Sequence, residues 1–172
     1  GSARMRDLLP GLGGLRPGFL GPAYETSLMS AIVGAHRRWS DERLERMAIS
    51  GFLADIGMLA LSDDVVEKPG PLSPSEEGAM RRHPEIGARL LTPLAGELPA
   101  VVAEVALQHH ERVDGRGYPR GLAGAQVLEE AQVVAICHLY LAAVTGRCYR
   151  RALAPWKVLA LLRRTVCSYA DP

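Results

Sequence analysis

The sequence has few cysteines, and their spacing excludes two kinds of structure. Cys137, Cys148 and Cys167 are the only three in 172 residues, and no two of them form a CxxC pair. An odd number without such a pair argues against a disulfide framework and against a thiolate zinc site. We therefore expect a protein of a reducing compartment, which predicts a cytoplasmic location.

Long apolar runs and an excess of charge of one sign are also missing. The apolar runs fall far short of the roughly 20 residues that a membrane span requires, and no signal peptide opens the chain. Basic residues number 20 and acidic residues 19, which leaves a formal net charge of +1. The total charge indicates neither a polyanion-binding protein nor an acidic tail, so we expect no membrane span and no DNA binding.

The start of the chain is rich in residues that break helices. Residues 8–22 contain five glycines and three prolines, and Gly1-Ser2 is typical of a scar left by tag removal. The length of 172 residues suits one domain with a real core. We therefore expect a lead-in over residues 1–22 and one folded domain over residues 23–172, with a C-terminal helix that is truncated.

Helical periodicity dominates the remainder of the chain. Apolar residues recur at steps of three and four and hardly ever alternate, which predicts helices and almost no strands. Ser40-Asp41 is a plausible N-cap for a helix that delivers Asp55 at its far end, and Ser73-Pro74 begins another helix after a loop over 62–74. Together these segments predict an all-α bundle of about seven helices. The later helices are expected over residues 74–82, 84–92, 100–111, 128–145 and 155–168.

The most informative stretch is HHERVDGRGYPRGL, residues 109–122. Two adjacent histidines, followed by two acids and a glycine-rich turn, place nitrogen and oxygen ligands where backbone can approach a bound phosphate closely. A histidine pair alone indicates little, but the whole string is close to the signature HHExxDGxGYPxGL. On this string the chain resembles the HD-GYP family, whose all-helical domains hydrolyse cyclic di-GMP.

The resemblance extends in register from Tyr24 to Pro172. Residues 53–58, LADIGM, stand where the family has LHDIGK, and residues 68–91 look like the family segment that leads to a metal-binding histidine. Residues 131–150 are similar to the family helix AxxxAxxDxxDALTxxRPYR. The resemblance implies the HD-domain helical bundle and a cluster of two or three metal ions that activates water.

Several metal ligands that the resemblance implies are changed in this sequence. Of the four ligands of the first ion only Asp55 remains, so we do not expect that ion and regard the chain as a degenerate member. The early histidine falls near Thr26 and the HD histidine is Ala54, while His36 lies ten residues beyond Thr26. The late aspartate is His138, the next acidic position is Leu141, and the lysine of HDIGK is Met58.

The implied ligands of the second ion are all present: Asp55, His83, His109 and His110. Three imidazoles and one carboxylate suit a single divalent ion such as Zn, Fe or Mn. His138 is a weaker candidate, as a replacement ligand. The alternative is that no metal binds and the histidines persist as ordinary polar residues.

The residues that the family resemblance implies for nucleotide binding are retained to a greater extent than the metal ligands. The resemblance implies that Arg147 and Arg150 contact phosphates and guanine edges, and a solvated basic helix end is the alternative for both. The loop would contribute Asp114, Gly117, Tyr118 and Pro119, of which the last two could instead shape the loop.

The residues lead to three functional hypotheses. The favoured one is a catalytically impaired HD-GYP domain that acts as a cyclic di-GMP sensor or as an interaction module for other signalling domains, for example of the diguanylate-cyclase type. The second is an active metal-dependent phosphodiesterase that converts cyclic di-GMP to pGpG or GMP with an altered or single-metal site. The third is a structural or dimerisation role unrelated to nucleotides.

Overall fold

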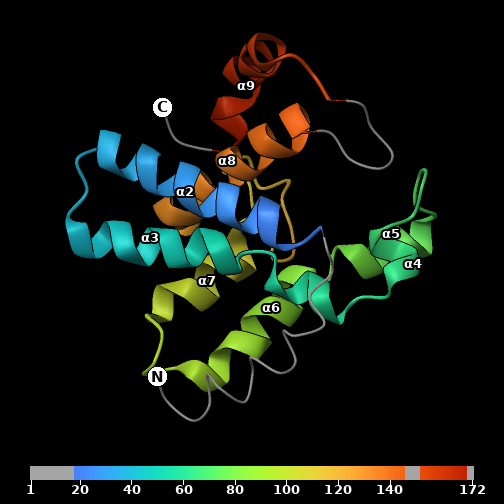
Figure 1. Cartoon of the computed structure of the whole chain (residues 1–172), viewed down its shortest axis with the longest axis horizontal. Coiled ribbons are helices and arrows are strands. Elements are labelled where there is room, and N and C mark those ends of the chain that lie inside the picture. Colours follow the sequence, from blue (N-terminus) through green and yellow to red (C-terminus); the bar gives the residue numbers. More distant parts are fainter. Residues whose placement is uncertain (1–17, 146–151, 170–172) are drawn as a thin grey trace.

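The computed structural model describes residues 18–145 and 152–169, and within these ranges the chain is helical (Figure 1). No strand occurs there, only two isolated bridges, Ala95 with Leu98 and Asp114 with Ala123. The predicted all-α bundle is confirmed. In chain order the elements are α2 (Leu20–His36), α3 (Asp41–Leu53), η1 (Ile56–Ala60), α4 (Asp63–Val66), α5 (Pro74–Met80), α6 (His83–Leu91), η2 (Thr92–Leu94), α7 (Ala100–Gln108), η3 (Gly124–Gln126), α8 (Glu129–Thr145) and α9 (Pro155–Tyr169).

Three boundaries differ from those expected. Helix α2 begins at Leu20, inside the expected lead-in, because Pro22 lies in the first turn, where its missing N–H is not needed. The expected loop over 62–74 contains the single turn α4, whose N-terminal dipole is stabilised by two aspartates. Helix α7 ends at Gln108 and not near residue 111, so both histidines of the HHE string lie in the turn that follows it.

Helices α2 and α3 form an antiparallel pair, seen side by side in Figure 1. The Ser27 hydroxyl donates to the carbonyl of Ala48 at 2.8 Å. A Cβ added to Gly51 would lie 3.0 Å from the Cα of Ser27, so the glycine permits the close approach. This packing brings the end of α3, and Asp55 beyond it, next to the first half of α2, where Thr26 is buried.

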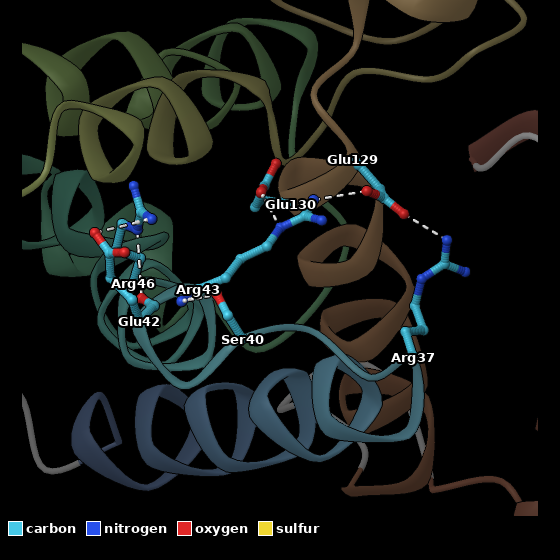
Figure 2. A network of polar contacts seen from close by, with 7 residues as sticks. All are labelled: Arg37, Ser40, Glu42, Arg43, Arg46, Glu129 and Glu130. Carbon is cyan, nitrogen blue, oxygen red and sulfur yellow. Dashed lines mark hydrogen bonds and ion pairs between the residues drawn. The ribbon is translucent and has the colours of Figure 1, made fainter.

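Charged side chains connect the α2–α3 turn to the start of α8 (Figure 2). Arg43 on α3 donates to Glu130 at 2.7 Å and to Glu129 at 2.6 Å, and Arg37 pairs with Glu129 as well. The Arg43 guanidinium carbon also lies 3.7 Å from the centroid of the Trp39 ring. Partly exposed ion pairs contribute little individually, and this network ties the first turn of α8 to α3 and to the α2–α3 turn.

The core is formed where α3, α7 and α8 meet. Met47, Val105 and Val134 come from these three helices and are 0% exposed. A smaller cluster, Ala143, Val158 and Leu162, packs α9 on α8.

Among the helices of the described residues, none combines the length and the apolar character that crossing a bilayer would require.

Candidate metal centre

Side chains from four separate segments converge beside this core. Asp55 follows α3, His83 begins α6, His109 and His110 follow α7, and His138 lies on α8 (Glu129–Thr145). One potential ligand atom from each of Asp55, His109, His110 and His138 lies within 4.8 Å of all the others. The Nε2 atom of His83 joins them, at 3.2 Å from Nε2 of His109 and 3.3 Å from Oδ1 of Asp55. Every ligand candidate from the sequence therefore belongs to one cluster.

His138 lies within the cluster although it was the weaker candidate. Its Nε2 atom is 3.2 Å from Oδ2 of Asp55. It comes from α8, whereas the other histidines come from α6 and the end of α7. The imidazole thus reaches the same carboxylate that His83 and His109 approach from the other oxygen.

Gly57 explains how Asp55 comes to lie beside His83. A Cβ on this residue would be 2.0 Å from the His83 carbonyl oxygen and 2.6 Å from the Gly87 nitrogen. Only a glycine allows η1 and α6 to touch backbone to backbone at this point. The glycine of the ADIG sequence is therefore required by packing.

Two of the rings are oriented by backbone carbonyls. Nδ1 of His83 lies 2.8 Å from the Met80 oxygen, and Nδ1 of His109 lies 2.9 Å from the Ala106 oxygen. A carbonyl can only accept, so each Nδ1 carries the hydrogen, and in a neutral ring Nε2 then presents a lone pair. Histidines that bind metals are commonly held in this way by a hydrogen bond from the other ring nitrogen.

The consequence is a set of lone pairs that face each other. The two Nε2 atoms are 3.2 Å apart, and both are within 3.4 Å of Oδ1 of Asp55, a buried oxygen with no hydrogen-bond partner. Neutral rings protonated on Nδ1 supply no hydrogen to that oxygen. Because a buried acceptor without a donor is costly, this arrangement fits a bound cation, and the nitrogen and oxygen donors suit a divalent transition metal.

The surroundings of Asp55 and His110 favour the protonation states that bind metals. Burial raises the pKa of Asp55, but positive charge on His138 and hydrogen bonds from His109 and His83 when these rings are protonated outweigh it and hold that pKa well below its usual range; a bound cation would supply the same positive charge while the rings stay neutral. Burial, followed by the charges of the neighbouring histidines, brings the pKa of His110 well below its usual value. An ionised carboxylate and a neutral imidazole are both ready to coordinate.

The two histidine positions implied for the ligands of a first ion carry no imidazole that could bind it there. Ala54 is 3% exposed and packs in the core cluster with Met47, Val105 and Val134. His36 is exposed at the far end of α2 and does not join the cluster. Among the residues that the structure describes, no other group of three or more histidine, cysteine or acidic side chains converges in this way.

The loop after the histidines is organised by Glu111, which the sequence did not single out as functional. Its side chain is 0% exposed and accepts hydrogen bonds from the backbone N–H groups of Arg120 at 2.6 Å and Leu122 at 3.0 Å. Its place in the HHE string was the available signal. The carboxylate therefore closes the loop over residues 111–122.

The predicted nucleotide-binding residues of this loop have internal partners. Asp114 accepts from Arg112 and from the N–H of Arg116, and the Arg112 hydrogen bond lowers the pKa of Asp114 to about 2. A Cβ on Gly117 would be 2.4 Å from the nitrogen of Arg112, so the loop is tightly folded there. The Tyr118 ring stacks on His110, and the bond from Tyr118 to Pro119 is cis. Arg147 and Arg150 lie outside the described residues.

Comparison with known proteins identifies relatives over most of the chain. The family model described as HD domain matches residues 15–172. A cyclic di-GMP phosphodiesterase of Pseudomonas aeruginosa is 40% identical over 124 residues, which cover 72% of this chain and 29% of that protein. The cyclic di-GMP phosphodiesterase response regulator RpfG of Xanthomonas campestris is 37% identical over 136 residues, covering 79% and 36%. This chain thus spans about a third of the length of such relatives.

Solved structures of low sequence identity share the fold. An HD-GYP-like protein of Bdellovibrio bacteriovorus has a TM-score of 0.73 at 16% identity, over 89% of this chain and 48% of that one. The HD domain of the L. monocytogenes phosphodiesterase PgpH, solved with cyclic di-AMP, has a TM-score of 0.69 at 17% identity, over 93% and 81%. At this identity the likeness shows the arrangement of helices and no more.

Proposed function

Since the chain belongs to the HD-domain family and carries the HD-GYP signature, we propose that it is a sensor for a cyclic dinucleotide, built around one metal ion and impaired in hydrolysis. The observation that supports this most directly is the convergence of the Nε2 lone pairs of His83 and His109 on the unpartnered Oδ1 of Asp55. Such a cluster is unfavourable without a cation at its centre. The ligands that remain suffice for one ion.

The number of ligands favours a binding role over a catalytic one. The group that could share one ion has three imidazoles and one carboxylate, and the His83 imidazole adjoins it, whereas catalytic zinc sites have three protein ligands and keep a coordination position open for water or substrate. An ion held there would supply polarisation of a phosphoryl oxygen and activation of a coordinated water. A neighbouring second ion would need ligands where Thr26 and Ala54 stand, and the Ala54 methyl group is packed in the core.

The ligand class is supported by relatives alone. Curated relatives are described as cyclic di-GMP phosphodiesterases, and one from Vibrio cholerae as a 3'3'-cGAMP-specific phosphodiesterase. We therefore propose a cyclic dinucleotide as the ligand, with Arg147 and Arg150 as predicted phosphate contacts. Iron, manganese and zinc are all compatible with the donor set, and contacts with other signalling domains remain a prediction.

A working single-metal phosphodiesterase is the second candidate. It is favoured by His138, whose Nε2 lies 3.2 Å from Asp55 and so substitutes in position for the family aspartate. Catalysis with a single ion keeps the polarisation of the phosphoryl group but loses the clamp on the attacking and leaving oxygens. Turnover would be much slower than with two ions.

The two candidates are separated by metal analysis and an assay on the same sample. We expect about one equivalent of metal after anaerobic loading with Fe, Mn or Zn, micromolar or tighter binding of cyclic di-GMP in calorimetry (about 8 kcal/mol), and no linear pGpG by chromatography. Two equivalents of metal, or metal-dependent turnover by the wild-type chain, would refute the sensor. Absence of both metal and nucleotide binding would refute both candidates.

A matched pair of variants sharpens this test. Ala54→His together with His138→Asp restores two ligands of the family pattern. If ligand loss is what limits hydrolysis, this double variant should bind more metal and gain activity, and circular dichroism must first show that it folds, because position 54 is packed in the core. His36→Ala, on an exposed position outside the cluster, is the control and should change neither.

A further inference from the structure

The Arg81 guanidinium lies over the ring of Tyr118, a contact that the sequence did not reveal. Its Cζ atom is 4.4 Å from the ring centroid, and the same ring stacks on His110 with centroids 4.7 Å apart and planes 13° apart. We propose that Arg81 is a positioning residue that acts through Tyr118 to hold the His110 ring toward the metal. This inference rests on the metal site of the proposed function.

His110 needs such a support more than its neighbours do. The Nδ1–H groups of His83 and His109 are each held by a backbone carbonyl. The imidazole of His110 makes ring contacts but no hydrogen bond with any described residue. A metal ligand normally has a partner that fixes its ring, and the Tyr118 ring takes that part here.

Arg81 in turn restrains Tyr118 from the segment that carries another ligand. The N–H of Tyr118 donates to the His110 carbonyl at 3.1 Å, which places its backbone, and the Arg81 guanidinium covers its ring. Arg81 is the C-cap of α5, two residues before His83, and also pairs with Glu77 at 3.6 Å. The guanidinium is planar and attracted to the face of an aromatic ring, so it couples the α5–α6 turn to the loop.

Cobalt binding measures this effect directly. We expect Arg81→Ala to weaken Co²⁺ binding about tenfold, the lower end for partners beyond the ligands, and to shift the visible absorption bands of bound Co²⁺. Arg81→Lys keeps a cation without the planar group, so its Co²⁺ affinity should lie between those of the wild type and Arg81→Ala. The matched control is Arg46→Ala: Arg46 pairs with Glu42 at 3.2 Å in the same i,i+4 arrangement (Figure 2) and is 40% exposed, and the cation–π contacts of the described residues involve Arg37, Arg43 and Arg81. It should bind Co²⁺ as the wild type does.

A double-mutant cycle tests whether Tyr118 is the intermediary. In a Tyr118→Leu background, Arg81→Ala should cause no further loss of Co²⁺ affinity, because the ring that transmits the effect is gone. An unchanged affinity and spectrum in Arg81→Ala, or the same tenfold loss in both backgrounds, would overturn the proposal.

A second readout needs no metal. Stacking on Tyr118 should shift the Cε1–H resonance of His110 in the NMR spectrum of the metal-free protein, and Arg81→Ala should move it toward the unstacked value while Arg46→Ala leaves it in place. If the wild type binds no Co²⁺, the proposed function fails, whereas this resonance still decides the positioning role. An identical resonance in wild type and Arg81→Ala would refute that role.

Discussion

Replacing Glu111 by alanine should destabilise the fold, although Glu111 is not one of the candidate metal ligands. The side chain is 0% exposed and both carboxylate oxygens accept backbone N–H groups, those of Arg120 and Leu122. Alanine would leave the two donors without a partner. The loop that carries the GYP residues would lose the carboxylate that closes it.

The magnitude follows from the two hydrogen bonds. A fully buried donor that loses its partner costs about 1–3 kcal/mol; these two hydrogen bonds are partly buried, and relief of the buried carboxylate offsets part of the sum, so we expect a loss of about 2–4 kcal/mol. For a chain of this length, 1 kcal/mol corresponds to about 2–4 °C, which predicts a fall in Tm of roughly 5–15 °C.

Urea denaturation and thermal melting of the metal-free protein measure this loss. The control is Glu104→Ala, because Glu104 lies on the preceding helix α7 and is 47% exposed, with a hydrogen bond from the Gln108 side chain at 3.1 Å and a pair to Arg120 at 3.9 Å. Its removal should cost less than about 1 kcal/mol. A loss below about 0.5 kcal/mol for Glu111→Ala would show that the loop does not depend on these bonds.

Three further predictions concern packing, pH and metal. Gly57→Ala should destabilise by about 3 kcal/mol or more in urea denaturation, because its Cβ would overlap backbone at 2.0 Å, whereas Gly78→Ala, with open space around it, should be neutral or slightly stabilising. The side-chain hydrogen bond from Lys68 lowers the pKa of Glu76 to about 2. The ionised Glu76 carboxylate therefore stabilises the fold fully above the ordinary pKa of 4.5, and this stabilisation is lost as the pH falls toward 2. Glu76→Gln should flatten that part of a curve of unfolding free energy against pH. Zn²⁺ at a hundred times its Kd should stabilise the fold by about 2.7 kcal/mol, or roughly 5–11 °C in a melting scan, and His109→Ala should remove most of this shift.

Much of the site could be predicted because its residues are carried by contiguous motifs. The resemblance to the HD-GYP family, carried by the HHE string, the ADIG sequence and the histidine before Pro84, implied His109, His110, Asp55 and His83 as ligands. The absence of a ligand at position 54 was equally plain, since a methyl group has no donor atom in any fold. What these motifs could not reveal was Glu111, whose role depends on amide groups nine and eleven residues further along the chain.

The helices were predicted because helical periodicity and caps are properties of a few neighbouring residues. Their ends were less certain, as α7 shows: it stops at Gln108, and its C-cap is His109. His138 is a weaker candidate in the sequence because its imidazole has to reach a pocket altered at Ala54, and only the packing of α8 against α3 and α7 brings it beside Asp55.

The sequence alone predicted that this chain is all-helical, carries the HD-GYP signature and differs from the family at three of the four ligands of the first ion. Only the tertiary structure decided that one carboxylate and four imidazoles meet, that the His83 and His109 rings present Nε2 to each other, and that Arg81 reaches His110 through Tyr118. The physical reason is one of range. A helix is set by contacts within one or two turns, whereas residues 55, 83, 109 and 138 become neighbours, and backbone carbonyls select their tautomers, only when four separate segments have packed together.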